Sequence, residues 1–303
     1  MKDPLDDVRA SPPLEILLHW VRERERVRIL KEDAGQPYPW TTDPIIGTYR
    51  FCNVRREDDR VTRWIQNHIR RPYIDHQNLW FMLCAARMIN WPDTLNVLMS
   101  SGNLAWPVDA HFRPEIMAEV LEGLATWRKV FTGAYIIPAP HKGGTKGGFM
   151  AERVLGQLWR DRTKFESHFD GTRIGVGQPT LRNTHALLSS YDYWGPFLAY
   201  QAIVDMRFTP LLMGAEDVST WCAAGPGTVR GLNRLAGRPL AYDPGQDAAR
   251  AAIVGLWHGI VERSKVRMDL SDVPNVLCET DKYMRVLYNQ GKPRARYVPG
   301  RAS

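Results

Sequence analysis

Apolar residues recur every three or four positions along much of the chain, which is the spacing of one buried helix face. The spacing is clear over residues 61–69 and 253–261, and Leu121 and Leu124 mark a further apolar face behind Pro114, a residue typical of helix starts. Further helices are expected at residues 14–31, 78–89, 150–158, 181–189, 196–206, 228–235 and 274–289. Strand-like alternation is nearly absent, and its best candidate is the short stretch 134–137.

This pattern predicts an all-α, mainly helical fold without internal repeats or low-complexity tracts. We expect a single helical domain over residues 14–289, with two helical lobes as the alternative. Residues 1–13 are expected to form a flexible N-terminus, and residues 290–303 a basic C-terminal tail. The largest irregular segment, 138–148, is rich in Pro, Gly and Lys and predicts a mobile basic loop that carries Lys142 and Lys146.

Charge adds a class of partner to this picture. The chain has a formal net charge of +7 and a pI of about 9.3, which favours polyanions such as DNA. Arginines crowd residues 55–71 and basic residues crowd 292–301, although a solvated surface explains each cluster equally well. The apolar runs are too short to span a bilayer, and the N-terminus lacks the apolar core of a secretory signal. A cytoplasmic protein is therefore expected.

Cysteine and histidine spacing argues against a zinc site. The four cysteines form no C-x-x-C pair, and the eight histidines show no H-E-x-x-H spacing. The segment Gly143-Gly144-Thr145-Lys146 lacks the G-x-x-x-x-G-K-[ST] pattern of a nucleotide-binding P-loop. No cofactor is predicted, and dependence on a divalent metal is left open.

Two glycine–proline segments open predicted helices. Exposed backbone N–H groups at a helix start, together with the helix dipole, suit a phosphate. Gly195 and Pro196, and likewise Gly225 and Gly227, are therefore candidate DNA contacts, as are Lys142 and Lys146 of the basic loop. Arg230 lies in the first turn after Gly227 and can add a planar charged group for phosphate. The alternative is that these segments are ordinary helix starts.

Two acidic positions are candidate bases. Asp217 follows Gly195 by about twenty residues, a spacing similar to that of the catalytic aspartate in helix–hairpin–helix DNA glycosylases; its alternative role is to cap the next turn. Glu279 and Lys282 lie three apart and share a face of the predicted helix. A functional role for them requires a partly buried pair, whereas the alternative is a surface ion bridge, as for Asp281 and Arg285.

A polar strip precedes the helix at residues 61–69. Asn53, Arg56 and Arg60 fall near one face if that helix begins this early, and Asp59 lies beside them. The alternative interpretation is a solvated helix face.

Together these elements resemble the phage alpha-glutamyl/putrescinyl thymine pyrophosphorylases, which share a helical domain with 5-hydroxymethyluracil DNA kinases. The resemblance runs from about Trp40 to Arg285, and its specificity comes from the order and number of the matching pieces. They are PWTTDP, FCNVRREDDRVTRWI, ARMINWPDT, FTGAYII, WGPFLAYQAIVDMR, DVSTWCAAGPGTVRGLNR and NVLCETDKYMRV.

The resemblance implies a relative of the DNA glycosylase fold, acting in the cytoplasm of a phage-infected bacterium. It implies a transferase that replaces the pyrophosphate on a thymine methylene of double-stranded DNA with an amino acid or amine. The missing P-loop favours this reaction over the kinase reaction. Residues that carry over by motif position are Asn53, Arg56, Asp59, Asp217, Glu279 and Lys282.

The chemistry requires a neutral amine and a neutralised leaving group. Because amines are protonated near pH 7, a general base is needed; Asp217 is expected to be the most sensitive carboxylate and to supply it, with Glu279 as the alternative. Arg56, Arg60 and Arg230 are expected to hold the pyrophosphate.

Two other functions compete with this one. A DNA glycosylase or lyase would use Asp217 against a sugar carbon, and a non-catalytic DNA-binding module would support a separate enzyme. The sequence does not identify the amine or the oligomeric state.

Overall fold

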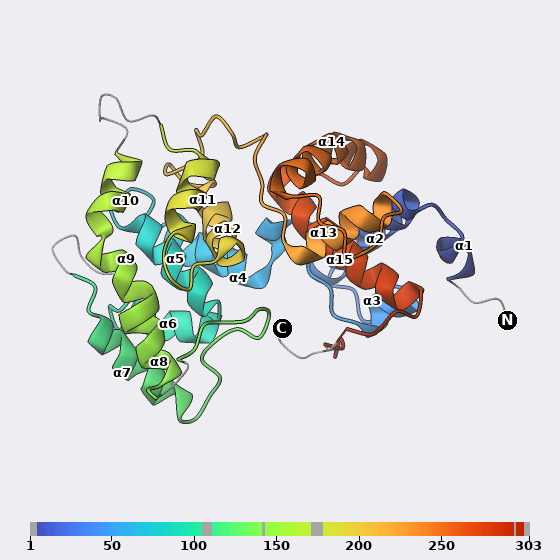
Figure 1. Ribbon diagram of the computed structural model, residues 1–303. Helices are drawn as coiled ribbons and strands as arrows, with labels where there is room; N and C mark the ends of the chain where they lie inside the picture. The colour runs from blue at the N-terminus through green and yellow to red at the C-terminus, as the bar shows by residue number, and fades with distance from the viewer. Residues whose placement is uncertain (1–4, 105–110, 141–142, 171–177, 294, 300–303) are drawn as a thin grey trace. The chain divides into compact units, whose positions relative to one another are not determined.

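The computed structural model describes residues 5–104, 111–140, 143–170, 178–293 and 295–299, and these are mainly helical (Figure 1). The all-α prediction is confirmed. Within these ranges the one β-type pairing is an isolated antiparallel bridge between Tyr49 and Arg296. The strand predicted at 134–137 is wrong, because this stretch finds no neighbouring strand among the described residues; there the side chain of Ile136 is exposed and the Tyr135 hydroxyl donates to the carbonyl of Arg87.

Contacts within the chain separate it into two compact units. Unit 1 combines Met1–Arg60 with Ser219–Ser303, and unit 2 is Val61–Val218. Unit 2 is therefore inserted, in sequence, between the two halves of unit 1. No described helix is both long enough and apolar enough to cross a membrane.

Unit 1 is built around three helices that pack on one another: α2, α13 and α15, drawn in blue, orange and red in Figure 1. Its helices are α1 (Asp6–Arg9), α2 (Pro13–Arg28), α3 (Pro44–Thr48), α13 (Pro226–Leu235), α14 (Gln246–Ser264) and α15 (Val273–Leu287), with a π turn at Ile29–Asp33 and 3-10 turns at Arg56–Asp58 and Leu270–Asp272. Trp20, Leu277 and Tyr283 are fully buried in this core.

Helices α13 and α15 approach so closely that two positions accept only glycine without rearrangement. A Cβ atom at Gly227 would lie 2.2 Å from the sulfur of Cys278, and one at Gly231 would lie 2.3 Å from the carbonyl oxygen of Leu277. The four-residue spacing puts both glycines on the same face of α13. This packing accounts for Gly227 without a bound anion.

Unit 2 contains α4 (Arg60–Ile65, whose first residue belongs to unit 1), α5 (Leu79–Ile89), α6 (Pro92–Ser100), α7 (Pro114–Ala125), α8 (Lys146–Gly148), α9 (Gly156–Arg160), α10 (Arg162–Phe169), α11 (Leu181–Ser189) and α12 (Pro196–Met206), with π turns at Gln66–Arg70 and Phe149–Leu155. In its core Arg87 of α5 donates two hydrogen bonds to Asp205 of α12, one of them at 2.8 Å, and a third to Thr62 at 2.7 Å. Asp205 is completely buried, so this ion pair joins α5 to α12 where solvent does not screen it.

Both ends of the described chain contact unit 1. The guanidinium of Arg9 donates to the carbonyl of Leu287 at the end of α15, at 3.2 Å. The backbone N–H of Tyr297 donates to the carbonyl of Thr48 at 2.9 Å, and the N–H of Arg50 donates to the carbonyl of Ala295 at 3.2 Å. Residues 295–297 thus lie alongside the end of α3.

Candidate active site

A partly buried Glu–Lys pair lies on α15 in unit 1. The ammonium of Lys282 is 2.6 Å from Oε2 of Glu279, and their side chains are 22% and 8% exposed. The same carboxylate oxygen accepts the backbone N–H of Cys52 at 3.0 Å. The pairing expected from the three-residue spacing, with the partial burial that a functional role requires, is confirmed.

The aromatic ring of Phe51 limits the space around this pair. The ammonium of Lys282 lies 4.6 Å from the centroid of the Phe51 ring, within the range of a cation–π contact. It is therefore placed between a carboxylate and an aromatic face. This arrangement holds a positive charge at a fixed position beside Glu279.

Arg24 of α2 adds a second cation that sequence reasoning missed. Its Nε donates to the carbonyl of Cys52 at 3.0 Å, and its Nη2 donates to the side-chain oxygen of Asn53. Its Nη1 is buried and forms no hydrogen bond with any described residue. Burial lowers the pKa of Arg24, even though the charges of Glu32 and Glu279 act in the opposite direction. A buried N–H donor without an acceptor suits an anionic ligand.

Two thiols border the pair, and both remain protonated at neutral pH. The charge of Glu279 is the largest cause that raises the pKa of Cys52; because this residue is exposed, we attribute the shift to charge more than to burial. Burial raises the pKa of Cys278 to about 11, with Glu279 contributing. Neither thiol is thus an activated nucleophile. Across the described residues, no group of three His, Cys, Asp or Glu side chains is arranged to hold a metal ion.

Asn53, Arg56, Asp59 and Arg60 do not share a helix face. The chain is irregular until the 3-10 turn Arg56–Asp58, and α4 begins only at Arg60, so the condition for a shared face, an earlier helix start, is not met. The reason is that acidic side chains of distant segments accept backbone N–H groups here. Glu279 accepts the N–H of Cys52, and Asp272 accepts the N–H of Arg56 at 2.8 Å. Asn53 still joins the site through Arg24, and the charge of Asp59 contributes to the raised pKa of Cys52.

Arg230 of α13 is anchored by Asp281, which lies two residues after Glu279 on α15. The Nε atoms of Arg230 and Arg234 lie 2.9 Å and 2.6 Å from the two oxygens of Asp281, which is buried. Asp281 therefore pairs with α13, whereas the sequence suggested Arg285 on its own helix. The side chain of Arg230 remains 42% exposed and so can reach a ligand from solvent. Gly225 forms the N-cap of α13, where no side chain caps the helix.

In unit 2, both carboxylate oxygens of Asp217 are engaged at the start of α11. Oδ1 accepts the N–H of Leu181 at 2.8 Å, and Oδ2 accepts the N–H of Arg182 at 2.9 Å. Asp217 thus caps a helix that lies far from it in the sequence, instead of the turn that follows it. A negative charge at a helix start is stabilising, so these contacts give Asp217 a structural role.

The other candidates of unit 2 lie at helix starts. Gly195 is the N-cap of α12, so no side chain caps this helix. The carbonyl of the next residue, Pro196, accepts a hydrogen bond from the ring of His185 at 2.9 Å. Lys146 opens the short helix α8, and burial lowers its pKa. Lys142 lies outside the described residues.

Comparison with known proteins gives one family. The family model described as the helical domain of 5-hmdU DNA kinase matches residues 11–293. The match includes the Glu279–Lys282 pair, Arg24 and nearly all of both units. Searches of the curated proteins and of the solved structures gave no significant match.

Proposed function

Because the chain belongs to the family of the 5-hmdU DNA kinase helical domain, we propose that it modifies thymine-derived bases in double-stranded DNA. In the proposed reaction the nitrogen of an amino acid or amine replaces a pyrophosphate on the base methylene. The family description names a kinase that acts on a DNA base. We place this chain at a step that uses the phosphorylated base.

The observation that carries the proposal is the Glu279–Lys282 pair beside the unpartnered Nη1 of Arg24. The amine lone pair forms the new C–N bond while the C–O bond to pyrophosphate breaks, and the amine proton passes to Glu279. Two fixed cations stabilise the charge that develops on the leaving oxygens. Arg56, Arg60 and Arg230 are proposed to bind the outer phosphate oxygens of the leaving group.

Glu279 is our first choice of base and Asp217 the second. Both oxygens of Asp217 already accept backbone N–H groups of α11, so proton uptake there would cost one of these bonds. The N–H of Cys52 and the ammonium of Lys282 both contact Oε2 of Glu279, which leaves Oε1 to accept a proton.

Each unit is proposed to offer its own DNA contacts: the uncapped helix start at Gly225 in unit 1, and the one at Gly195 together with Lys146 in unit 2. The reacting base would leave the helical stack, as in other enzymes that act on bases. The net charge of +7 supports the choice of a polyanion.

The test is incubation of the protein with duplex DNA that carries the pyrophosphorylated hydroxymethyl base and a pool of amines, among them glycine, serine, glutamate and putrescine. A new aminated nucleoside found by mass spectrometry, with equimolar release of pyrophosphate, supports the proposal. Abasic DNA would instead identify a glycosylase. Tight binding without any new nucleoside would identify a binding module.

A further inference from the structure

Three aromatic side chains form an open box on the surface of unit 1, outside the candidate active site. The ring of Tyr38 stacks on Tyr297 with 6.2 Å between centroids, and Trp40 meets the edges of Tyr38 and Tyr297 at 5.4 Å and 5.9 Å. Tyr38 is 46% exposed. We call Tyr38, Trp40 and Tyr297 the aromatic box.

Hydrogen bonds hold two of the three residues of the box, Tyr297 and Trp40. Tyr297 is held by the hydrogen bond from its N–H to Thr48 and by the neighbouring bridge between Arg296 and Tyr49. The indole N–H of Trp40 donates to the carbonyl of Gln36 at 2.7 Å. Rings fixed in this way lose little conformational freedom when a ligand stacks on them.

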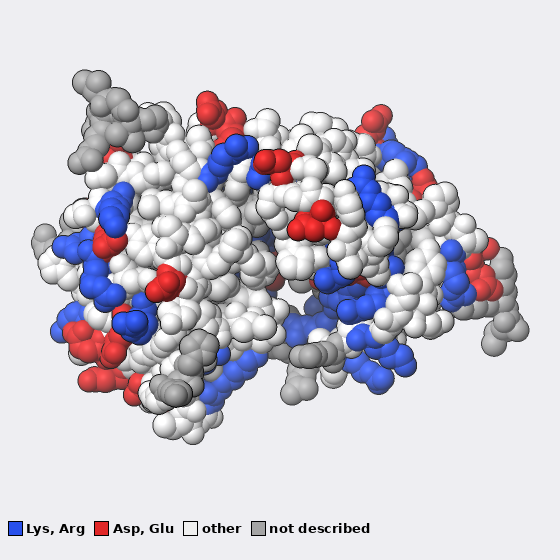
Figure 2. Space-filling model, in the orientation of Figure 1, with Lys and Arg blue, Asp and Glu red and all other residues white. Residues whose placement is uncertain are grey.

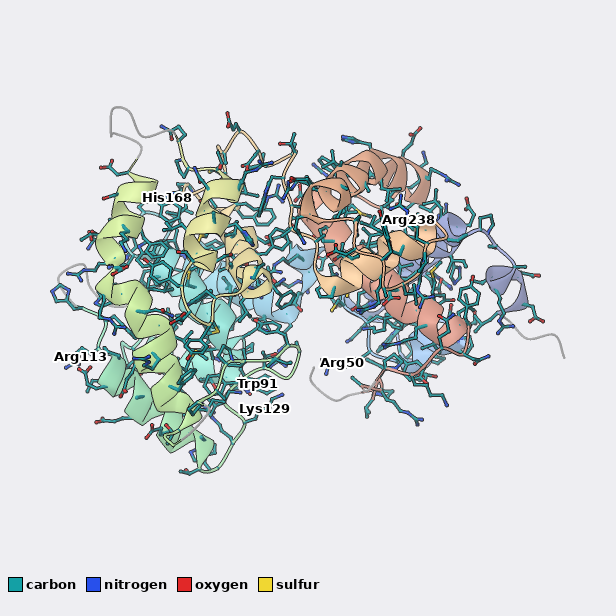
Figure 3. All side chains as sticks on the ribbon, viewed as in Figure 1. Arg50, Trp91, Arg113, Lys129, His168 and Arg238 are labelled. Carbon is teal, nitrogen blue, oxygen red and sulfur yellow. The ribbon has the colours of Figure 1, made fainter. Side chains whose placement is uncertain are left out.

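Cations surround the box. The ammonium of Lys31 lies 5.5 Å from the Trp40 ring and 5.7 Å from the Tyr297 ring. The charges of Arg24 and Arg50 act on the Tyr297 hydroxyl, where they lower a pKa that burial raises. Basic side chains gather over α3 and the nearby C-terminal segment in Figure 2, and Arg50 is labelled in Figure 3.

We propose that the aromatic box stacks an unpaired base of the DNA substrate, while Lys31 and Arg50 bind the adjacent phosphates. Aromatic rings accept any base face, and cations beside them track the backbone of a single strand. Lys31 already occupies the cation-binding position over the rings of Trp40 and Tyr297. The exposed ring of Tyr38 therefore fits a neutral aromatic ligand better than an ammonium ligand.

Arg24 connects the box to the candidate active site. Arg24 bonds to Cys52 and Asn53, and its charge acts on the Tyr297 hydroxyl. The backbone joins the same two segments, because the N–H of Arg50, two residues before Cys52, donates to the carbonyl of Ala295, two residues before Tyr297. This inference rests on the proposed function for the choice of DNA as ligand.

The first experiment is photocrosslinking of the full chain to oligonucleotides that contain 5-iodouracil, as single strands and as a duplex with one mismatch. Mass spectrometry of the products should find crosslinks at Tyr38, Trp40 or Tyr297. Crosslinks confined to other residues would overturn the inference even if amine transfer is normal.

The second experiment compares variants of matched tyrosines. Tyr38→Leu should weaken binding of a single-stranded oligonucleotide about tenfold without changing the slope of affinity against salt, because stacking is lost and phosphate contacts remain. The control is Tyr242→Leu, since Tyr242 is 48% exposed and has Arg238 at 5.3 Å from its ring (Arg238 is labelled in Figure 3). Equal affinities of the two variants for the oligonucleotide would refute the proposal that the aromatic box stacks a base. Absence of any DNA binding by the wild-type chain would refute both proposals.

Discussion

Replacement of Glu279 by Gln tests the candidate active site most directly. Glutamine keeps the shape and the acceptor for the Cys52 N–H, but it removes the charge that faces Lys282. Hydrogen bonds that involve a charged group contribute about 1.5–3 kcal/mol, and the 22% exposure of Lys282 reduces this through solvent screening. We expect a loss of about 1–2 kcal/mol in unfolding free energy, which lowers the Tm by roughly 2–8 °C.

The effect on the reaction should be much larger than the effect on folding. Loss of a general base typically reduces a rate by about 10²–10⁴-fold. The assay measures amine transfer to pyrophosphorylated DNA at several pH values, at a temperature well below the Tm of every variant. The matched control is Asp281→Asn, which removes a buried carboxylate two positions away on α15 that binds Arg230 and Arg234.

Asp281→Asn should destabilise unit 1 and slow amine transfer by about tenfold at most, through the lost anchor of Arg230, since Asp281 takes no proton in the proposed step. If the folded Glu279→Gln protein transfers amine at the wild-type rate, Glu279 is not the base. If both variants lose activity in proportion to stability, the role of the pair is structural.

Three further outcomes are expected. Asp217→Asn should lower the Tm, because it removes a charge from the start of α11, and leave transfer near the wild-type rate; a hundredfold slower reaction in a folded protein would make Asp217 the base. Gly227→Ala should lower the free energy of unfolding by about 1–3 kcal/mol, because its new Cβ meets Cys278. Adding Cys278→Ala to the same chain should recover part of that loss in denaturant titrations. No recovery would contradict the packing argument. Burial lowers the pKa of His168, which is labelled in Figure 3, so the folded state binds this proton less readily than the unfolded state. The contribution of His168 to the free energy of unfolding is fully present above about pH 6.5 and is lost as the pH falls through the folded pKa. Unfolding titrations at two pH values should show this loss in wild type and in a His258→Gln control but less of it in His168→Gln.

The helices were predictable where proline or glycine marks their ends and one face is apolar. Residues 181–189 and 196–206 match α11 and α12 from end to end. Helix α10 escaped prediction because Phe165 is its one buried side chain, which leaves no apolar spacing to detect.

The site was predictable only where its partners are close in sequence. Glu279 and Lys282 lie one helical turn apart, so their spacing indicated the pair. Arg24 stands in an alternating run of charges that is typical of a solvated face, and its partners Cys52 and Asn53 belong to another segment. For Gly227 the sequence could not distinguish an anion site from close helix packing, since both favour the same residue.

The split organisation of unit 1 has a consequence for synthesis. Helix α2 leaves the ribosome long before its partner α15, with all of unit 2 translated in between. At about 5–20 residues per second, the apolar face of α2 waits on the order of tens of seconds for its partners. Unit 2 is one continuous segment and can collapse during that interval. The core of unit 1 can therefore close only after α15 has emerged, so the unit whose first helix is made before unit 2 completes its fold after it.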